Sequence, residues 1–152
     1  MEYNCKILNQ PSQPILSITA KTPQSDLKKV QETALNSIIS YLRNLDKGPS
    51  GPPFTVFYDM DINNLDIEIG YPVERKTNGQ NEVVSGEIPE GKYVSCVYKG
   101  DHDEIESAYE ALMIYANENG YETIGTCYEF YLNCNEPENM EIKIMFPLKE
   151  KE

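Results

Sequence analysis

Residues 55–73 read TVFYDMDINNLDIEIGYPV, and residues 128–148 repeat their order as YEFYLNCNEPENMEIKIMFPL. Each stretch has a short apolar run, a polar turn and a second run in which apolar and polar residues alternate. Alternation with a period of two is typical of strands, and the turn between the runs predicts a hairpin. The repeat indicates one supersecondary unit used twice.

The repeat extends upstream of both hairpins. SITAKT at 17–22 precedes a run with helical spacing from Leu27, and SCVYKG at 95–100 precedes a similar run from Ile105. Apolar residues three and four apart predict an amphipathic helix in each place. We expect strands at 15–21, 54–59, 65–73, 92–99, 126–132 and 140–146, helices at 27–45 and 105–116, an exposed connector at 74–87 and a charged tail at 149–152.

Two strand-helix-strand-strand repeats predict an α+β fold. We expect a pseudo-twofold axis between the repeats, a curved antiparallel sheet, both helices on one face of it and a ligand cleft on the other. The whole of 1–152 is expected to form a single domain. Its first repeat covers about 1–75, its connector about 76–87 and its second repeat about 88–149.

The period of two also assigns side chains to the faces of the sheet. The residues expected to point toward the helices are Phe57, Phe130, Ile67, Ile69, Ile142 and Ile144. Those expected on the other face are Phe54, Val56, Tyr58, Glu68, Glu129, Tyr131, Lys143 and Met145. The second face combines aromatic rings with carboxylates, so it is the expected lining of the cleft.

Glu129 is the first functional candidate. In the sequence alignment of the two repeats, Glu129 takes the position of Val56, so a carboxylate replaces an apolar residue in mid-strand. Burying a carboxylate costs desolvation free energy, and packing alone would not favour such a residue there. In an apolar cleft it would serve as the counter-ion of an organic cation, with tyrosine rings adding cation-π attraction. The structural alternative is a cross-strand pair with Lys143. Tyr58 and Tyr131 have the corresponding alternative of being ordinary sheet residues.

Composition limits the class of partner. With 25 acidic and 13 basic residues the net charge is −12, which argues against direct nucleic-acid binding and favours cations. No apolar run approaches the ~20 residues of a membrane span, and no leader precedes the first strand, so we expect a cytoplasmic protein without membrane contact. Four cysteines without a CxxC pair and a single histidine predict no metal site and no cofactor.

Four segments in order resemble the GyrI-like small-molecule-binding family, which also forms the effector-binding half of AraC-type and multidrug-responsive regulators. These segments are GPPFTVFY at 51–58, IPEGKY at 88–93 with its strand to Gly100, YEFYLN at 128–133 and IMFPL at 144–148. The resemblance covers nearly the whole chain. It implies a stand-alone multidrug-type sensor or sequestering protein for lipophilic, cationic aromatic molecules. It places the family's glutamate at Glu129 and its pocket walls at Phe54, Tyr58 and Tyr131. Glu68 and Met145 complete the expected ligand contacts.

Two alternatives stay open. The family includes hydrolases of cyclopropane-containing genotoxins, in which Glu129 would act as general base and Tyr131 would steady the leaving oxygen. It also includes a gyrase inhibitor, and an acidic surface that imitates DNA would use the cluster Asp101, Asp103, Glu104 and Glu106. No particular protein partner is predicted. His102 is interpreted as a solvated residue at the start of a helix.

Overall fold

The computed structural model describes residues 3–134, 136 and 138–151, with Asp103 described through its backbone only. The chain has an α+β fold in which the strands pair antiparallel, as the sequence predicts. It divides into two compact units. Ser12–Pro89 form the central unit, and Met1–Pro11 together with Glu90–Glu152 form the split unit, so the chain leaves the split unit and later returns to it.

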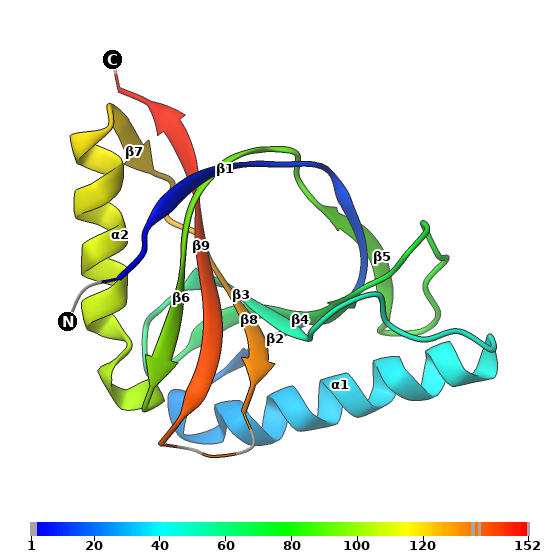
Figure 1. Cartoon of the computed structure of the whole chain (residues 1–152). Coiled ribbons are helices and arrows are strands. Elements are labelled where there is room, and N and C mark those ends of the chain that lie inside the picture. The colour runs from blue at the N-terminus through cyan, green and yellow to red at the C-terminus, as the bar shows by residue number, and fades with distance from the viewer. Residues whose placement is uncertain (1–2, 135, 137, 152) are drawn as a thin grey trace. The chain divides into compact units, whose positions relative to one another are not determined.

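The central unit has its strands in the order β3-β4-β2-β5, and one helix covers a face of this sheet. Its elements are β2 (Gln13–Thr22), the short 3-10 helix η1 (Gln24–Asp26), α1 (Leu27–Asn44), β3 (Phe54–Asp59), β4 (Leu65–Pro72) and β5 (Val84–Ile88). Ala34, Ile38 and Leu42 are the buried residues of α1, four apart as the helical spacing requires. They pack α1 onto β2 and β4 (Figure 1).

The split unit repeats this arrangement with the strand order β1-β6-β9-β8, while β7 pairs with the end of β9. Its elements are β1 (Lys6–Gln10), β6 (Gly91–Gly100), the 3-10 helix η2 (His102–Glu104), α2 (Glu106–Glu118), β7 (Tyr121–Thr123), β8 (Cys127–Asn133) and β9 (Met140–Glu150). Ala108, Leu112 and Ala116 are the buried residues of α2, and α2 packs on β6, β7 and β9.

The two hairpins superpose in sequence, but their strand register differs by one residue from the alignment expected from the sequence. In the central unit Thr55 lies opposite Ile69, and in the split unit Glu129 lies opposite Ile144. Each hairpin then has a register shift, between Phe57 and Asp59 in one and between Tyr131 and Asn133 in the other. Glu129 is therefore the counterpart of Thr55, and the alignment with Val56 was wrong.

This shift corrects the predicted faces of the split unit. Phe130 pairs with Lys143, whereas Glu129 and Tyr131 pair with Ile144 and Ile142. Directly opposed residues share a face, so Glu129 and Tyr131 lie on the α2 side of the sheet and Phe130 on the other. In the central unit the predicted faces are confirmed, because Phe57 pairs with Ile67 and Val56 with Glu68.

Three strands were not predicted. β1 pairs with β6, β5 occupies part of the expected connector at 74–87, and β7 follows α2. The expected charged tail at 149–152 is also wrong in part, since β9 continues to Glu150. Among the described residues, no helix is both long enough and apolar enough to cross a bilayer.

Candidate functional site

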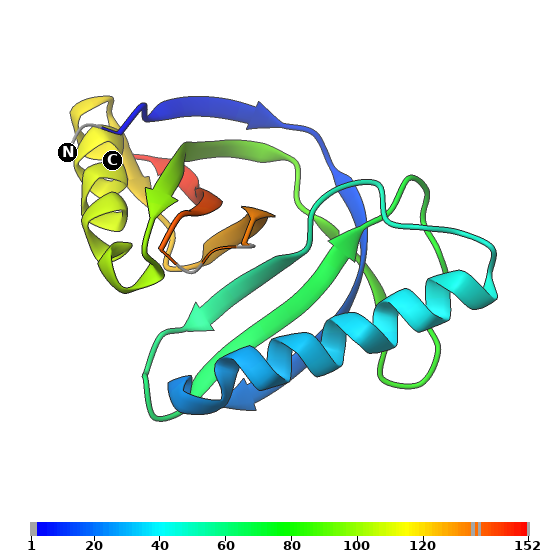
Figure 2. The same ribbon diagram turned by 60° about the horizontal axis from the view of Figure 1, so that its bottom comes forward.

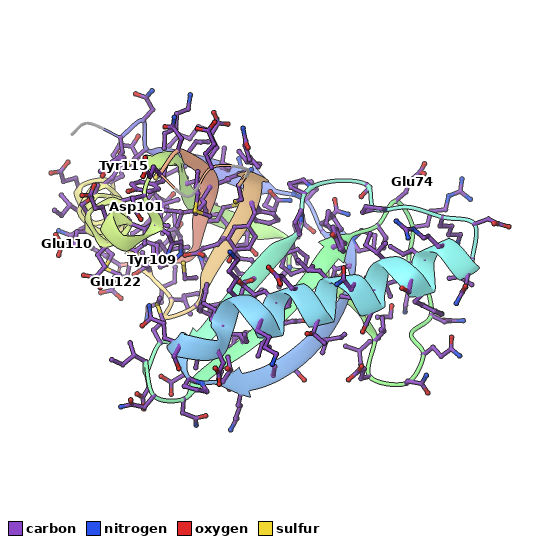
Figure 3. All side chains as sticks on the ribbon, turned by 90° about the horizontal axis from the view of Figure 1, so that it is seen from below. Glu74, Asp101, Tyr109, Glu110, Tyr115 and Glu122 are labelled. Atoms are coloured by element: carbon purple, nitrogen blue, oxygen red, sulfur yellow. The ribbon has the colours of Figure 1, made fainter. Side chains whose placement is uncertain are left out.

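Glu129 lies in the middle of β8, and its side chain is almost completely buried, with 1% exposed. It belongs to a cluster of polar side chains on the α2 side of the split unit's sheet. Tyr131, two residues along the same strand, donates its hydroxyl proton to Oε1 of Glu129 at 3.0 Å. Tyr109 of α2, which Figure 3 labels, donates to Oε2. His102 of η2 places Nε2 3.4 Å from Oε1.

The position of Tyr109 follows from the local sequence. It lies four residues after Ile105 and thus on the same face of α2 as the buried stripe, which turns its ring toward the sheet. Its ring meets Phe146 of β9 edge-to-face, with the centroids 5.7 Å apart. Gln31 is the corresponding residue of α1, and it donates to Thr55 at 2.9 Å. In both units, therefore, a polar contact at equivalent positions links the helix to the sheet. In the split unit the two groups are a phenol and a carboxylate.

The pKa values of two groups beside Glu129, the Tyr109 hydroxyl and the Cys127 thiol, are raised, so both groups keep their protons. Burial, followed by the charge of Glu129, raises the pKa of Tyr109 far above its ordinary value. The same two causes raise the pKa of the Cys127 thiol, which also contacts Tyr109. Tyr109 therefore keeps its proton and acts as a hydrogen-bond donor over the physiological range. The arrangement holds one carboxylate between two phenol donors.

In the part of the chain that the structure describes, no lysine or arginine forms an ion pair with Glu129. Among the described residues, the ion pairs of lysine are Lys99 with Glu141 and Lys149 with Glu122, and none involves Glu129. The cross-strand pair with Lys143, considered as the structural alternative, does not form. Lys143 points to the opposite face, where its Nζ lies 5.9 Å from the centroid of the Phe130 ring, and burial lowers its pKa.

A second polar group lies in the central unit. Glu68 of β4 accepts from Ser17 of β2 and from Tyr58 of β3, both at 2.5 Å. This group lies on the sheet face that α1 does not cover, as predicted for Tyr58 and Glu68. Phe54 is completely buried and lies opposite Gly70 on the same side.

The structure thus brings together two pairs of the predicted residues, Glu129 with Tyr131 and Tyr58 with Glu68. Met145 is 1% exposed and pairs with Tyr128, so it faces away from Glu129.

Sequence reasoning missed Tyr109 and His102. The interpretation of His102 as a solvated residue at a helix start is correct only in part, because 35% of its side chain is exposed while its ring contacts the buried carboxylate. The helical stripe already contained Tyr109, but its polar partner depends on the register of β8. In the acidic cluster, Glu104 and Glu106 are exposed, Asp101 is half-buried, and the side chain of Asp103 lies outside the described part of the chain.

Comparison with known proteins places this arrangement in a family. The sequence model of the family described as "GyrI-like small molecule binding domain" matches residues 3–149. Among curated proteins, none matches the chain.

Solved structures with the same fold include several of low sequence identity. The crystal structure of the EcmrR C-terminal domain aligns with a TM-score of 0.79 and 21% identity, covering 99% of this chain and 100% of that one. In the EcmrR–DNA complex, the TM-score is 0.76 at 21% identity, and this chain (98% covered) spans only 58% of the EcmrR chain.

Two further structures carry functional descriptions of their own. A hydrolase encoded by lin2189 from Listeria innocua aligns with a TM-score of 0.73 and 13% identity, covering 95% of this chain and 91% of that one. SAV2435, solved bound to tetraphenylphosphonium, aligns with a TM-score of 0.63 and 13% identity, covering 98% and 94%. At these identities the likeness establishes the fold.

Proposed function

The chain belongs to the GyrI-like small molecule binding domain family, and from this premise we propose that it binds lipophilic, cationic aromatic molecules with Glu129 as their counter-ion. The ligand class agrees with SAV2435, whose structure contains tetraphenylphosphonium, an aromatic cation. Tyr131, Tyr109 and His102 would surround the same carboxylate. In the central unit, taken by itself, we further propose Tyr58, Phe54 and Glu68 as ligand contacts.

One observation carries the proposal: Glu129 is buried without a lysine or arginine partner among the described residues. A buried carboxylate loses hydration, and two phenol donors recover only part of that loss. A cation of low hydration brought next to it would recover more, because opposite charges attract strongly away from bulk water. The binding energy therefore depends on ligand charge.

The neighbouring rings would add to this preference. The faces of tyrosine rings attract cations by about 0.5–2 kcal/mol each, depending on how far the pair is removed from water. His102 is the most accessible member of the cluster, with 35% of its side chain exposed. We propose that a ligand reaches Glu129 by replacing the His102 ring at Oε1.

The decisive experiment compares a cation with a neutral molecule of similar shape. Tetraphenylphosphonium and triphenylphosphine oxide are titrated by calorimetry into the wild-type protein and into Glu129→Gln. Because the substitution removes charge and keeps the shape, we expect the cation to lose about 1–3 kcal/mol of binding free energy. The neutral ligand should change little.

Glu68→Gln is the comparison that locates the counter-ion, since Glu68 also accepts two hydroxyl donors but belongs to the other unit. A larger loss of cation binding in this variant than in Glu129→Gln would assign the counter-ion to Glu68. Equal weakening of both ligands by Glu129→Gln would leave Glu129 a purely structural role. Circular dichroism and urea unfolding of each variant separate lost binding from lost folding.

Hydrolysis of cyclopropane-bearing genotoxins is the second candidate, and the contact between His102 and Glu129 favours it. A carboxylate that accepts from two phenols and touches an imidazole holds groups for acid–base chemistry. Glu129 would take a proton from water as the water oxygen bonds to a ring carbon and the strained C–C bond breaks. Tyr131 would donate to the substrate oxygen on which the negative charge of the opened ring develops. The hydrolase from Listeria innocua shares the fold only.

The same Glu129→Gln variant distinguishes the two functions. A hydrolase converts a cyclopropane-bearing alkylator into a ring-opened, hydrated product over many turnovers, and loses this activity in Glu129→Gln. A binding protein leaves the compound unchanged, or traps it in equal molar amount. We expect the second result. In that case the protein acts as a cytoplasmic sensor or sequestering protein, a location that the four unpaired thiols support.

A further inference from the structure

The edge of β2 offers a separate binding surface in the central unit. β5 pairs with β2 only from Gln13 to Ser17, whereas β4 pairs with it from Ile15 to Thr22. Beyond Ser17, β2 is therefore the edge of the sheet. At ~3.3 Å per residue, the open stretch from Ile18 to Thr22 is about 16 Å long.

The register shows which backbone groups point out from this edge. Val73 donates to the carbonyl of Pro14 at 2.9 Å, so even-numbered residues of β2 exchange their hydrogen bonds with β4. The backbone N–H and C=O groups of the odd-numbered residues point away from β4, and β5 supplies their hydrogen-bond partners as far as Ser17. The N–H and C=O groups of Thr19 and Lys21 have no such strand partner in the described part of the chain. Both residues are exposed.

A groove runs beside this open edge. It has a volume of about 560 Å³ and lies between Ile18–Thr22 of β2 and the side of α1 that carries Lys29, Val30 and Thr33, with Asp26 of η1 and Glu82 also on its wall. In Figure 2 the end of β2, the blue arrow, lies beside the first turns of α1. An edge strand with a helix alongside is the arrangement that accepts an added strand.

We propose that this groove binds an extended peptide, which adds to β2 as a new antiparallel or parallel strand at the sheet edge. Thr19 and Lys21 would supply up to four backbone hydrogen bonds. Alternate side chains of the peptide would point toward α1 and contact Ala20 and Val30, and the intervening ones would stay in solvent. The proposal is independent of Glu129, which lies in the other unit.

Charge favours a foreign peptide over a second copy of the chain. The charges that line the groove sum to zero, because two basic residues, Lys21 and Lys29, offset two acidic ones, Asp26 and Glu82. The whole chain carries a net charge of −12, so two copies repel each other while a basic peptide is attracted. The expected partner is thus an extended segment with apolar residues at every second position and basic residues at its ends.

A display library of random octapeptides, selected on the immobilised full chain, tests the proposal. Thr19→Pro removes the outward N–H at a position where an edge strand tolerates proline, and Thr19→Val keeps that N–H. We expect selected peptides to alternate apolar and polar residues. They should bind Thr19→Pro at least tenfold more weakly than the wild type, and Thr19→Val like the wild type.

Hydrogen exchange on the wild-type protein gives a second readout that needs no variant. The amides of Thr19 and Lys21 should become protected when a selected peptide binds, and N-methylation of alternate peptide residues should abolish both binding and protection. The proposal is overturned if no selected peptide distinguishes Thr19→Pro from Thr19→Val, if protection appears elsewhere, or if sedimentation shows the edge already paired between two copies.

Discussion

At the scale of single residues, Tyr109 shows how burial fixes a protonation state. Its hydroxyl donates to Glu129, and burial and the nearby carboxylate together raise its pKa. An unfolded tyrosine ionises near pH 10. Because the folded pKa is higher, the stabilisation is complete below pH 10 and is lost as the pH rises above it.

We therefore predict that the free energy of unfolding falls above about pH 10, and that Tyr109→Phe flattens this fall. Each tyrosine whose folded pKa is raised contributes a slope of up to about 1.4 kcal/mol per pH unit. Urea unfolding between pH 8 and 11 measures the slope. Tyr131→Phe is the comparison, since its hydroxyl contacts the same carboxylate. An unchanged slope in Tyr109→Phe would contradict the assignment.

At the scale of elements, β4 depends on one glycine. A Cβ at Gly70 would lie 2.3 Å from the carbonyl oxygen of Leu16 and 3.0 Å from the Phe54 ring. The backbone of β2 would have to move, so we predict that Gly70→Ala destabilises the protein by about 1–3 kcal/mol. Gly86→Ala in β5 is the control, because its Cβ would be 3.8 Å from the nearest atom. Equal unfolding midpoints in urea for the two variants would refute the prediction.

The hairpins also show what the sequence could and could not predict. Helical and alternating spacing were sufficient to find both repeats, because burial of one face imposes those periods. The register of β8 was not readable, because FY occurs in both hairpins and suggests an alignment one residue off. A register shift leaves no mark in residue type. This one-residue difference in register places Glu129 on the α2 side of the sheet, where Tyr109 donates to it.

Short strands escaped prediction for a different reason. β7 has three residues and β5 contains Gly86, so neither offers enough alternation to be recognised. Such strands form because a longer strand already presents its edge. Their existence is a tertiary property, and the same is true of the contact between His102 and Glu129.

At the scale of the whole molecule, the acidic charge is unevenly divided. The split unit carries 15 acidic and 6 basic residues, and the central unit 10 and 7, which gives −9 and −3 for the ranges of the two units. The unit with Glu129 is thus the more negative one. Such a field raises the local concentration of cations.

We predict that the association rate of tetraphenylphosphonium falls several-fold between 10 mM and 300 mM salt, because the Debye length shrinks from about 30 Å to well under 10 Å. Stopped-flow measurements give the rate. Triphenylphosphine oxide should show no such dependence. A salt effect of the same size on both ligands would mean that the field does not act on the charge of the ligand.

The division of the chain also sets the order in which the protein can fold during synthesis. β1 is synthesised before the central unit, whereas its partner β6 begins only at Gly91, after the whole central unit. The central unit can thus fold while β1 is still unpaired. The strand β8, which carries Glu129, can pair with β9 only after β9 has been made. If Glu129 is the counter-ion that we propose, a nascent or truncated protein without β9 therefore cannot capture the ligand.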